Sequence, residues 1–507
     1  MKEMSRTYVL YRRKMKSSIA PCFLRYGVYF AAVFAVGSVI YAAGVLVRGT
    51  GSPAFLAVAP VCVMVPALLF LLCCCITRKF HSLWSKLMEL IRTQPDSASE
   101  SGKFDVLDEA LLEILRDALA GKGPSARREL SEEEWRTLLQ KADRHAVLSL
   151  LYDALDELPL PKNQMELVTR TSRRTVLQYY RMSVYTHQVV KLLKERGITA
   201  VVLKGVSAAA VYPTPELRKS GDIDILLPNP EQMSLARDTL LEAGYAVSEI
   251  QPVHHHLVMK FEAGIELELH TMLAEPFDNA RINRYLRDCL RDISGHIEQR
   301  DVMGYEIPVL SEGYQAYQLL LHMLQHFLRS GFGLKLLCDW VCFWNRPAAE
   351  EEIRLYLKLV DESGVSGFSR MVTSLCVSYL GLDRDCCLCG HMGDVMEEAE
   401  VRGFMRDILE AEEFGKSGKD RMVILRGTKL WDYVREFHHM MNLNYPRAGK
   451  IFLLWPVLWC CTLLRFLINN RKVRGVKTGE VLKKARERSN RMEQLELFKT
   501  QSEKKRQ

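Results

Sequence analysis

Two long runs of apolar residues stand near the start of the chain, at 26–47 and 53–77. Neither run contains a charged side chain, and the loop 48–52 between them is short. A helix rises about 1.5 Å per residue, so about 20 apolar residues cross the roughly 30 Å hydrocarbon core of a bilayer. A cleaved signal peptide has a shorter apolar region and no second span after it. The pattern therefore predicts a transmembrane hairpin within residues 1–95.

Lys and Arg lie on both outer flanks of this hairpin, whereas the loop between the two runs has only Arg48. Flanks that are rich in Lys and Arg stay in the cytoplasm. The pattern thus predicts a multi-pass protein of the cell membrane, in which everything after residue 78 faces the cytoplasm.

The rest of the chain changes its hydrophobic period twice. Residues 104–196 have the spacing of amphipathic helices and include a helix start signal, SEEEW. Residues 197–310 have short apolar runs, TAVVL, DIDILL, HLVMKF and IELELH, which read as strands, with helix-like stretches at 206–211 and 231–243. Helical spacing returns over 311–445. This order predicts an α/β core flanked by helical domains.

A third apolar run, 451–468, lies in the last segment, 446–507, and is interrupted by a proline and an arginine. If it crossed the membrane once, the basic tail would lie outside, against the charge rule. The run is therefore interpreted as an interfacial helix anchored by Trp455 and Trp459. A buried core helix is the alternative.

Charge is distributed unevenly along the chain. The first 25 residues carry +6 and the stretch from Arg465 onward carries +9, while the whole chain is +8, which leaves −7 for the part between them. Basic ends predict attraction to anionic membrane lipids. The acidic middle disfavours nucleic acid as a partner.

The chain has 14 cysteines, several of them inside apolar runs, where cysteine behaves as a small hydrophobe. A cytoplasmic domain is expected to keep its thiols reduced. Cys386, Cys387, Cys389 and His391 offer four zinc ligands, but adjacent cysteines suit one tetrahedral site poorly. Unpaired thiols in a loop between helices are the favoured interpretation.

Acidic side chains alternate with apolar ones in two of the predicted strands. Asp222 and Asp224 stand at i and i+2 and share one face, and Glu266 and Glu268 do the same in IELELH. Carboxylate oxygens suit Mg²⁺, which gathers phosphate oxygens in phosphoryl and nucleotidyl transfer. An acidic pair facing water is the rival interpretation of Asp222 and Asp224 taken alone, and spacing does not decide between Glu266 and Glu268.

Upstream of the acidic pair, a strand ending in LKG opens into a predicted helix. The first amides of a helix can hold a phosphate, which makes Gly205 and the residues up to Ser207 candidates for nucleotide binding. Lys204 and Arg218 are expected to add positive charge to that pocket.

The segment LKG, followed by YPTPELRKSGDIDILL and then ELELH, resembles the uncharacterised nucleotidyltransferase family of the polymerase β-like nucleotidyltransferase superfamily. The likeness extends over roughly residues 130–460. It implies a nucleotidyltransferase-like core with a mixed sheet, and it implies that Asp222, Asp224 and Glu268 are the catalytic, metal-binding carboxylates, with Glu268 chosen over Glu266. Val206, which stands between the glycine and the serine of the phosphate loop, departs from the usual superfamily pattern.

This resemblance leads to two hypotheses on function. The first is a membrane-anchored nucleotidyltransferase that moves a nucleoside monophosphate from a nucleoside triphosphate to an acceptor with two Mg²⁺ ions. The second is a catalytically inactive nucleotide-binding or scaffold protein at the membrane. Neither the acceptor nor the choice of nucleoside triphosphate is specified by the residues. The superfamily also implies nucleotide contacts from Lys335 and Asp339, whereas His322 and His326 are interpreted as packing residues in preference to a zinc pair.

Overall fold

The computed structural model describes residues 104–411 with short gaps, and scattered residues between 438 and 498. The gaps fall at 126–128, 248–255, 261–263, 278, 330 and 392–395. The chain divides into two compact units, one made of Met1–Pro95 and Val434–Gly479, the other of Asp96–Tyr433 and Glu480–Gln507. The predicted hairpin lies outside the described residues. Within the described part, no helix has the length and apolar character needed to cross a membrane.

The larger unit begins with the helical region that the sequence predicts. Its α4 helix starts at a capping box, in which Ser131 and Glu134 exchange side-chain and backbone hydrogen bonds, and it buries Trp135 and Leu138. The elements of this region are α3 (Val106–Leu119), α4 (Glu132–Arg144), the 3-10 helix η1 (Leu148–Leu151), α5 (Tyr152–Asp156) and α6 (Lys162–Glu195).

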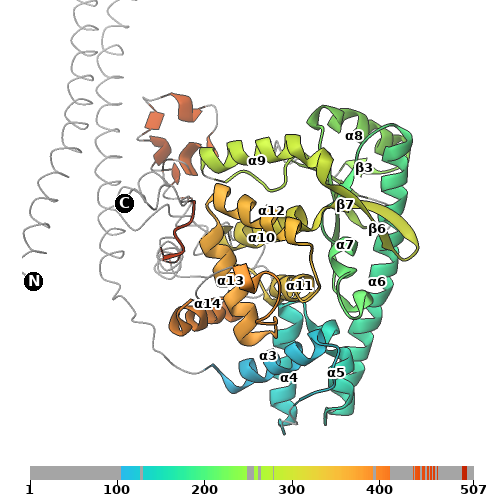
Figure 1. Cartoon of the computed structure of the whole chain (residues 1–507), viewed down its shortest axis with the longest axis vertical. Helices are drawn as coiled ribbons and strands as arrows, with labels where there is room; N and C mark the ends of the chain where they lie inside the picture. Colours follow the sequence, from blue (N-terminus) through green and yellow to red (C-terminus); the bar gives the residue numbers. More distant parts are fainter. Residues whose placement is uncertain are drawn as a thin grey trace, which may run out of the picture. The chain divides into compact units, whose positions relative to one another are not determined.

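Helix α6 joins this region to the sheet. It has 34 residues, so it is about 51 Å long at 1.5 Å per residue. It contacts η1 and α5 near its start, and α7 (Val206–Ala209), α8 (Met233–Glu242) and β7 (Tyr305–Leu310) further along. Figure 1 shows α6 running along one side of the unit from the α3–α5 region to α8. The helical region and the sheet are therefore built on one common helix.

The sheet has seven strands in the order β3-β4-β5-β2-β1-β7-β6. β2 pairs parallel with β5, and β1 pairs parallel with β7, while the other neighbours are antiparallel. The sheet is thus mixed, with β2 in its centre. The strands are β1 (Val201–Val202), β2 (Asp222–Leu226), β3 (Ala246–Val247), β4 (His256–Lys260), β5 (Glu266–His270), β6 (Ile297–Val302) and β7.

The two faces of β2 have different surroundings. Ile223 and Ile225 belong to a core cluster that also contains Val189 and Leu193 of α6. Leu226 instead belongs to the larger cluster formed with the helices that follow the sheet. Because side chains alternate along a strand, Asp222 and Asp224 lie on this second face, toward the C-terminal helices.

Among the described residues, five α-helices follow the sheet within the region predicted to be helical. They bury a group of aromatic side chains, including Trp340, Trp344 and Tyr356, whose rings lie 5.3–5.9 Å apart between centroids. The helices are α10 (Glu312–Arg329), α11 (Leu334–Trp344), α12 (Glu350–Ser363), α13 (Ser366–Tyr379) and α14 (Glu398–Ala411). A further helix, α9 (Ala280–Asp292), precedes β6 and is capped by the side chain of Asn279.

The described residues near the C-terminus belong to the same unit. Leu495 is buried in the larger core cluster, and the backbone N–H of Phe498 donates to the carbonyl of Gly364 at 2.7 Å. The Arg281 guanidinium donates to the carbonyl of Phe498, also at 2.7 Å. This part of the basic tail is therefore packed against the folded unit, a role that the charge pattern does not predict.

Of the predicted interfacial run, 451–468, only scattered residues are described. Trp455 and Trp459 both lie against the ring of His438, at 4.5 and 5.9 Å between centroids, within the smaller unit. Contact with a lipid surface by this run stays a prediction.

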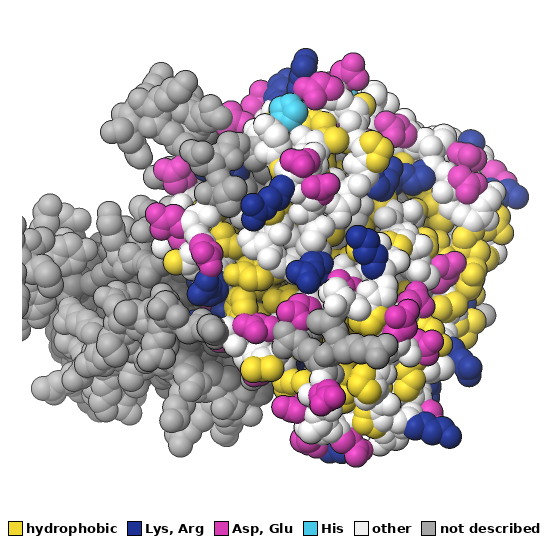
Figure 2. Space-filling model, turned by 60° about the horizontal axis from the view of Figure 1, so that its bottom comes forward, with side chains coloured by type: hydrophobic (Ala, Val, Ile, Leu, Met, Phe, Trp, Pro, Cys, Tyr) yellow, Lys and Arg dark blue, Asp and Glu magenta, His cyan; other side chains and the backbone are white. Residues whose placement is uncertain are grey.

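Acidic and basic side chains are interspersed on the face of the molecule drawn in Figure 2, and neither sign forms a continuous patch on the described part of that face. This agrees with the modest net charge that the sequence assigns to the middle of the chain.

Candidate metal and nucleotide site

The site is built by the parallel pair of β2 and β5. Their register places Asp222 opposite Glu266, Asp224 opposite Glu268, and Leu226 opposite His270. Burial alternates along β5, so Glu266, Glu268 and His270 share one face while the leucines between them are buried on the other. Local alternation and parallel pairing together bring the carboxylates of two distant segments side by side.

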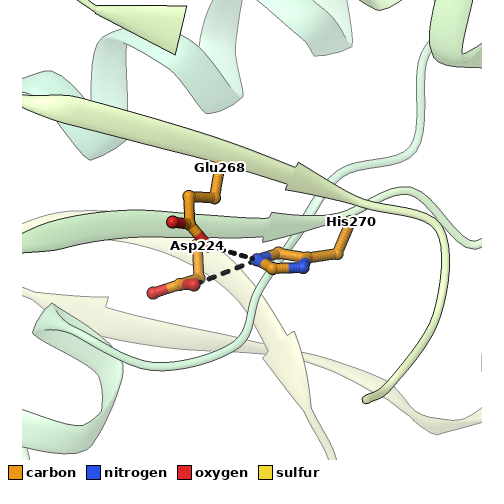
Figure 3. A group of neighbouring side chains, drawn as sticks. All are labelled: Asp224, Glu268 and His270. Carbon is orange, nitrogen blue, oxygen red and sulfur yellow. Dashed lines mark hydrogen bonds and ion pairs between the residues drawn. The ribbon is translucent and has the colours of Figure 1, made fainter. Parts of the chain in front are cut away.

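Three of these side chains converge closely, as Figure 3 shows. His270 Nε2 lies 3.0 Å from Asp224 Oδ1 and 3.4 Å from Glu268 Oε2. A ligand atom of each of Asp224, Glu268 and His270 lies within 4.8 Å of the other two. Among the described residues, this is the one group of three or more such side chains that could hold a metal ion.

Lys204 joins the group from the loop after β1. Its Nζ lies 3.1 Å from Asp224 Oδ1 and 3.6 Å from Asp222 Oδ2. The Asp224 side chain is fully buried, whereas 39% of the Asp222 side chain is exposed. The ammonium group therefore bridges the inner and the outer aspartate.

One carboxylate oxygen of the buried Asp224 has no hydrogen-bond partner among the described residues. Asp224 Oδ2 is buried and accepts no hydrogen bond from any residue that the structure describes. A buried, ionised oxygen without a partner is costly, and an ion or ligand is the usual explanation. Hard carboxylate oxygens are the ligands that Mg²⁺ prefers, so Asp224 and Glu268 fit a divalent ion of this kind.

The charges of the cluster shift one another's pKa values. Burial lowers the pKa of His270, but the hydrogen bonds to Asp224 and Glu268 outweigh it and raise this pKa to about 9. Burial raises the pKa of Asp224, yet Lys204 and His270 bring it below its ordinary value. The hydrogen bond from His270 lowers the pKa of Glu268. All three groups are therefore charged near neutral pH, and the carboxylates stay ionised.

Helix α10 places a histidine near the site, and positive charges surround this histidine. His322 of α10 is half-buried, and its pKa lies well below the ordinary value, first because of desolvation and then because of electrostatic interactions with Lys204, His326, Lys335 and His270. His322 is therefore a neutral side chain beside the site. His322 and His326, interpreted from the sequence as packing residues in preference to a zinc pair, do not belong to any metal-binding group of the described residues.

Glu266 takes a different direction from Glu268. Its Oε1 lies 2.9 Å from Lys260 Nζ of the neighbouring strand, and both side chains are about half exposed. The two glutamates that spacing alone leaves equivalent thus have separate environments, with Glu268 beside Asp224 and Glu266 at the surface.

The predicted phosphate loop lies next to the aspartates. Gly205 has φ 71° and ψ −115°, a conformation that favours glycine, and a Cβ here would lie 3.3 Å from the carbonyl oxygen of Asp222. Helix α7 after it has four residues. Ser207 is fully buried, and its hydroxyl donates to the carbonyl of Lys204 at 3.3 Å. The structure therefore shows the serine hydroxyl bonded to its own loop.

Arg218 differs most from its predicted role. Its Nε and Nη2 donate to the two carboxylate oxygens of Asp339 at 2.6 and 2.8 Å, and its Nη1 donates to Gly205 O and Ser220 Oγ. Tyr212 donates to the same carboxylate at 2.6 Å. Arg218 is 4% exposed, so it secures the Gly205 turn to α11. Neither Arg218 nor Asp339 presents a free charge to a phosphate.

His270 is the member of the site that the sequence interpretation did not single out. The signal is present in IELELH, because the histidine continues the alternation of Glu266 and Glu268 on the same face. His270 is the third polar residue at this spacing, and the three together indicate which face of the strand carries the site.

Comparison with known proteins gives a match to a protein family and a likeness to a solved structure. Residues 131–381 match the family model described as an uncharacterised nucleotidyltransferase. A crystal structure of an antigenic nucleotidyltransferase-like protein from Paracoccidioides brasiliensis is similar at 12% identity, over 40% of this chain and 93% of that chain, with a TM-score of 0.26. No curated protein matches the chain.

The family match begins at the capping residue of α4 and ends just after α13, so it includes both strands of the site. It is shorter than the expected range of 130–460. Residues 131–381, with their mixed sheet and flanking helices, are therefore similar to the uncharacterised nucleotidyltransferase family.

Proposed function

We propose that the chain is a membrane-anchored enzyme that transfers a nucleoside monophosphate from a nucleoside triphosphate to an acceptor and releases pyrophosphate. Asp222, Asp224 and Glu268 would hold two Mg²⁺ ions. The observation that carries the proposal is the buried Asp224, which has one carboxylate oxygen without a partner and lies beside Glu268 on a parallel strand. The family match supports a nucleotide substrate.

When bound, Mg²⁺ would offset negative charge on the phosphates of the nucleotide. The chain's own residues supply the remaining parts of the mechanism. Lys204, held between the two aspartates, places a positive charge at the mouth of the site, where it would attract the triphosphate. The exposed Asp222 faces incoming ligands, whereas the buried Asp224 is oriented by Lys204 and His270.

Glu268 is suited to accept a proton from the acceptor. It is ionised near neutral pH because the hydrogen bond from His270 lowers its pKa. An ionised carboxylate close to the reacting hydroxyl can act as a general base. His270 acts through Glu268 and Asp224 as a positioning residue, since it donates toward both from one ring nitrogen.

The test uses the full chain in detergent, with each labelled nucleoside triphosphate, Mg²⁺ and a membrane extract that contains the acceptor. We expect label on an acceptor and release of pyrophosphate with wild-type protein, and neither with Asp224→Asn. Glu266→Gln is the matched control, because it removes a carboxylate from β5, the strand next to that of Asp224, but at an exposed ion pair. Stabilisation by nucleotide without any transfer would support the alternative of an inactive nucleotide-binding protein.

The membrane part of the proposal rests on the apolar runs 26–47 and 53–77 and on the basic flanks. In a cysteine-free background, Thr50→Cys should react with an impermeant thiol reagent applied to intact cells, whereas Ser99→Cys should not. Labelling at residue 99 alone would reverse the topology, and a chain recovered entirely from the soluble fraction would exclude the anchor.

A further inference from the structure

Three cysteines and a histidine lie in the segment after α13, which ends with the short helix η5 (Cys389–His391). The histidine is engaged elsewhere, since His391 Nδ1 lies 2.9 Å from the carbonyl of Cys387 and its Nε2 lies 3.3 Å from Glu350 Oε1. These side chains do not form a metal-binding group in the described part of the chain. Two of the sulfurs, those of Cys386 and Cys389, do come together.

The sulfurs of Cys386 and Cys389 lie 3.1 Å apart and share a hydrogen bond. The backbone N–H of Cys389 donates to the carbonyl of Cys386 at 3.0 Å, which closes a four-residue turn. The end residues of such a turn have Cα atoms within about 7 Å, and a disulfide needs about 4.4–6.8 Å. The backbone is thus already close to the geometry of a disulfide.

The turn is held in place by its neighbours. The N–H of Asp383 donates to Asn345 Oδ1 of the α11 end at 2.9 Å, and the N–H of Cys386 donates to the carbonyl of Asp383. Leu388, between the two cysteines, is fully buried in the main core cluster. The two sulfurs therefore meet because of packing that reaches well beyond the turn.

The two thiols are also unequal as acids. The hydrogen bond with Cys389 is the largest effect on Cys386 and, with the backbone N–H groups of Cys389 and Leu388, lowers its pKa to about 7 against the effect of burial. The same hydrogen bond raises the pKa of Cys389. A thiolate beside a thiol in Cys-x-x-Cys spacing is the usual arrangement of reactive dithiols.

We propose that Cys386 and Cys389 are a redox site, in which a peroxide oxidises the two thiols to a disulfide and a thiol reductant restores them. Cys386 is 8% exposed, so a small oxidant reaches its sulfur more readily than a bulky disulfide does. This inference is independent of the nucleotide site.

The chemistry proceeds in two steps that balance. The Cys386 thiolate attacks one oxygen of hydrogen peroxide and breaks the O–O bond; the leaving hydroxide takes up a proton and becomes water, and a sulfenic acid remains on Cys386. The Cys389 sulfur then attacks the Cys386 sulfur, the S–O bond breaks, and the hydroxide leaves as water with the Cys389 proton. Two thiols are oxidised, and one peroxide is reduced to two waters.

The experiment treats the full chain in detergent with hydrogen peroxide, blocks the remaining thiols and maps the peptide 385–402, which trypsin releases with all three cysteines. We expect this peptide to lose two hydrogens and to keep one blocked thiol, and dithiothreitol to restore three free thiols. Cys387→Ser is the matched control and should still form the disulfide. Cys386→Ser and Cys389→Ser should not form it.

A second measurement separates the roles of the two sulfurs. In Cys389→Ser, the sulfenic acid has no resolving thiol, so dimedone should trap it at residue 386. Three outcomes would each overturn the proposal. They are three thiols that are still free after peroxide treatment of wild type, a disulfide or adduct at Cys387, and protection of all three thiols by zinc. None of these measurements requires transferase activity.

Discussion

Two clusters of buried charge lie within the larger unit, and they are completed to different degrees. In the first, Arg218, Asp339 and Tyr212 satisfy one another, with two hydrogen bonds from the guanidinium and one from the hydroxyl to a single carboxylate. In the second, Asp224 is paired through one oxygen with Lys204 and His270, while its other oxygen has no partner among the described residues. The complete cluster supports the fold, and the incomplete one offers a ligand atom.

Breaking the complete cluster should have the largest effect on stability. Asp339→Ala leaves the Arg218 guanidinium buried without its partner, and we expect the free energy of unfolding to fall by about 3–5 kcal/mol. Denaturant unfolding of the full chain in detergent measures this change.

The matched control for that loss replaces both partners, Arg218→Leu with Asp339→Leu. Removing a whole buried ion pair is often close to neutral, so the double variant should be more stable than Asp339→Ala. A double variant as unstable as the single one would show that Arg218 and Asp339 do not form the unit described.

Breaking the incomplete cluster should act mainly on ligand binding and activity. Asp224→Asn removes a charged metal ligand, and a loss of about 3 kcal/mol in transition-state stabilisation lowers the transfer rate about 100-fold. Thermal unfolding with Mg²⁺ and nucleotide should show little of the ligand-induced stabilisation, which for wild type is about 2.7 kcal/mol at a ligand concentration of 100 times Kd. Unchanged stabilisation by ligand would falsify the metal-site assignment.

Gly205 lies between the two clusters, and its substitution should affect both moderately. Alanine at φ 71° and ψ −115° is strained, and its Cβ would lie 3.3 Å from Asp222 O, so Gly205→Ala should cost about 1–3 kcal/mol of stability. Because Arg218 bonds to the Gly205 carbonyl and Asp222 lies beside it, transfer activity should fall as well. Unaltered stability in chemical unfolding would contradict the conformation at this residue.

The smallest effect is expected at the carboxylate that the structure leaves outside the site. Glu266→Gln breaks one exposed ion pair with Lys260, which is worth at most about 1 kcal/mol, and it should leave the transfer rate unchanged. A large drop in rate with normal folding would bring Glu266 into the site and weaken the contrast with Glu268.

The sequence predicts which acidic residues share one face of the sheet, because their alternation with apolar residues is a local property. It does not predict the partners that neutralise them. Lys204 meets Asp224 because β1 and β2 are antiparallel neighbours, and Arg218 meets Asp339 across 121 positions of sequence. These pairings depend on tertiary packing, so a basic residue near an acidic motif is easily assigned to a ligand when it serves the fold.

Some strands are easier to predict from the sequence than others, because the strength of their hydrophobic pattern differs. β2 and β5 have clear hydrophobic patterns, whereas β6 is mostly exposed or half-buried and its pattern is weak. The turn between β6 and β7 consists of Met303 and Gly304, both with positive φ. Asn or Asp usually stands at the first position of such a turn. Because Met303 stands there instead, the sequence does not predict this hairpin.

The parallel pairing of β1 with β7 has a consequence for how the chain folds. Val202 lies opposite Val309, about 100 residues later, while the other side of β1 pairs with β2. Contacts between such distant segments form slowly, because a long loop must close before they are gained. During synthesis, one edge of β1 therefore stays unpaired until the ribosome has released the residues of β7. A nascent chain that stalls before residue 310 would present that central edge to other chains, which makes it prone to aggregation.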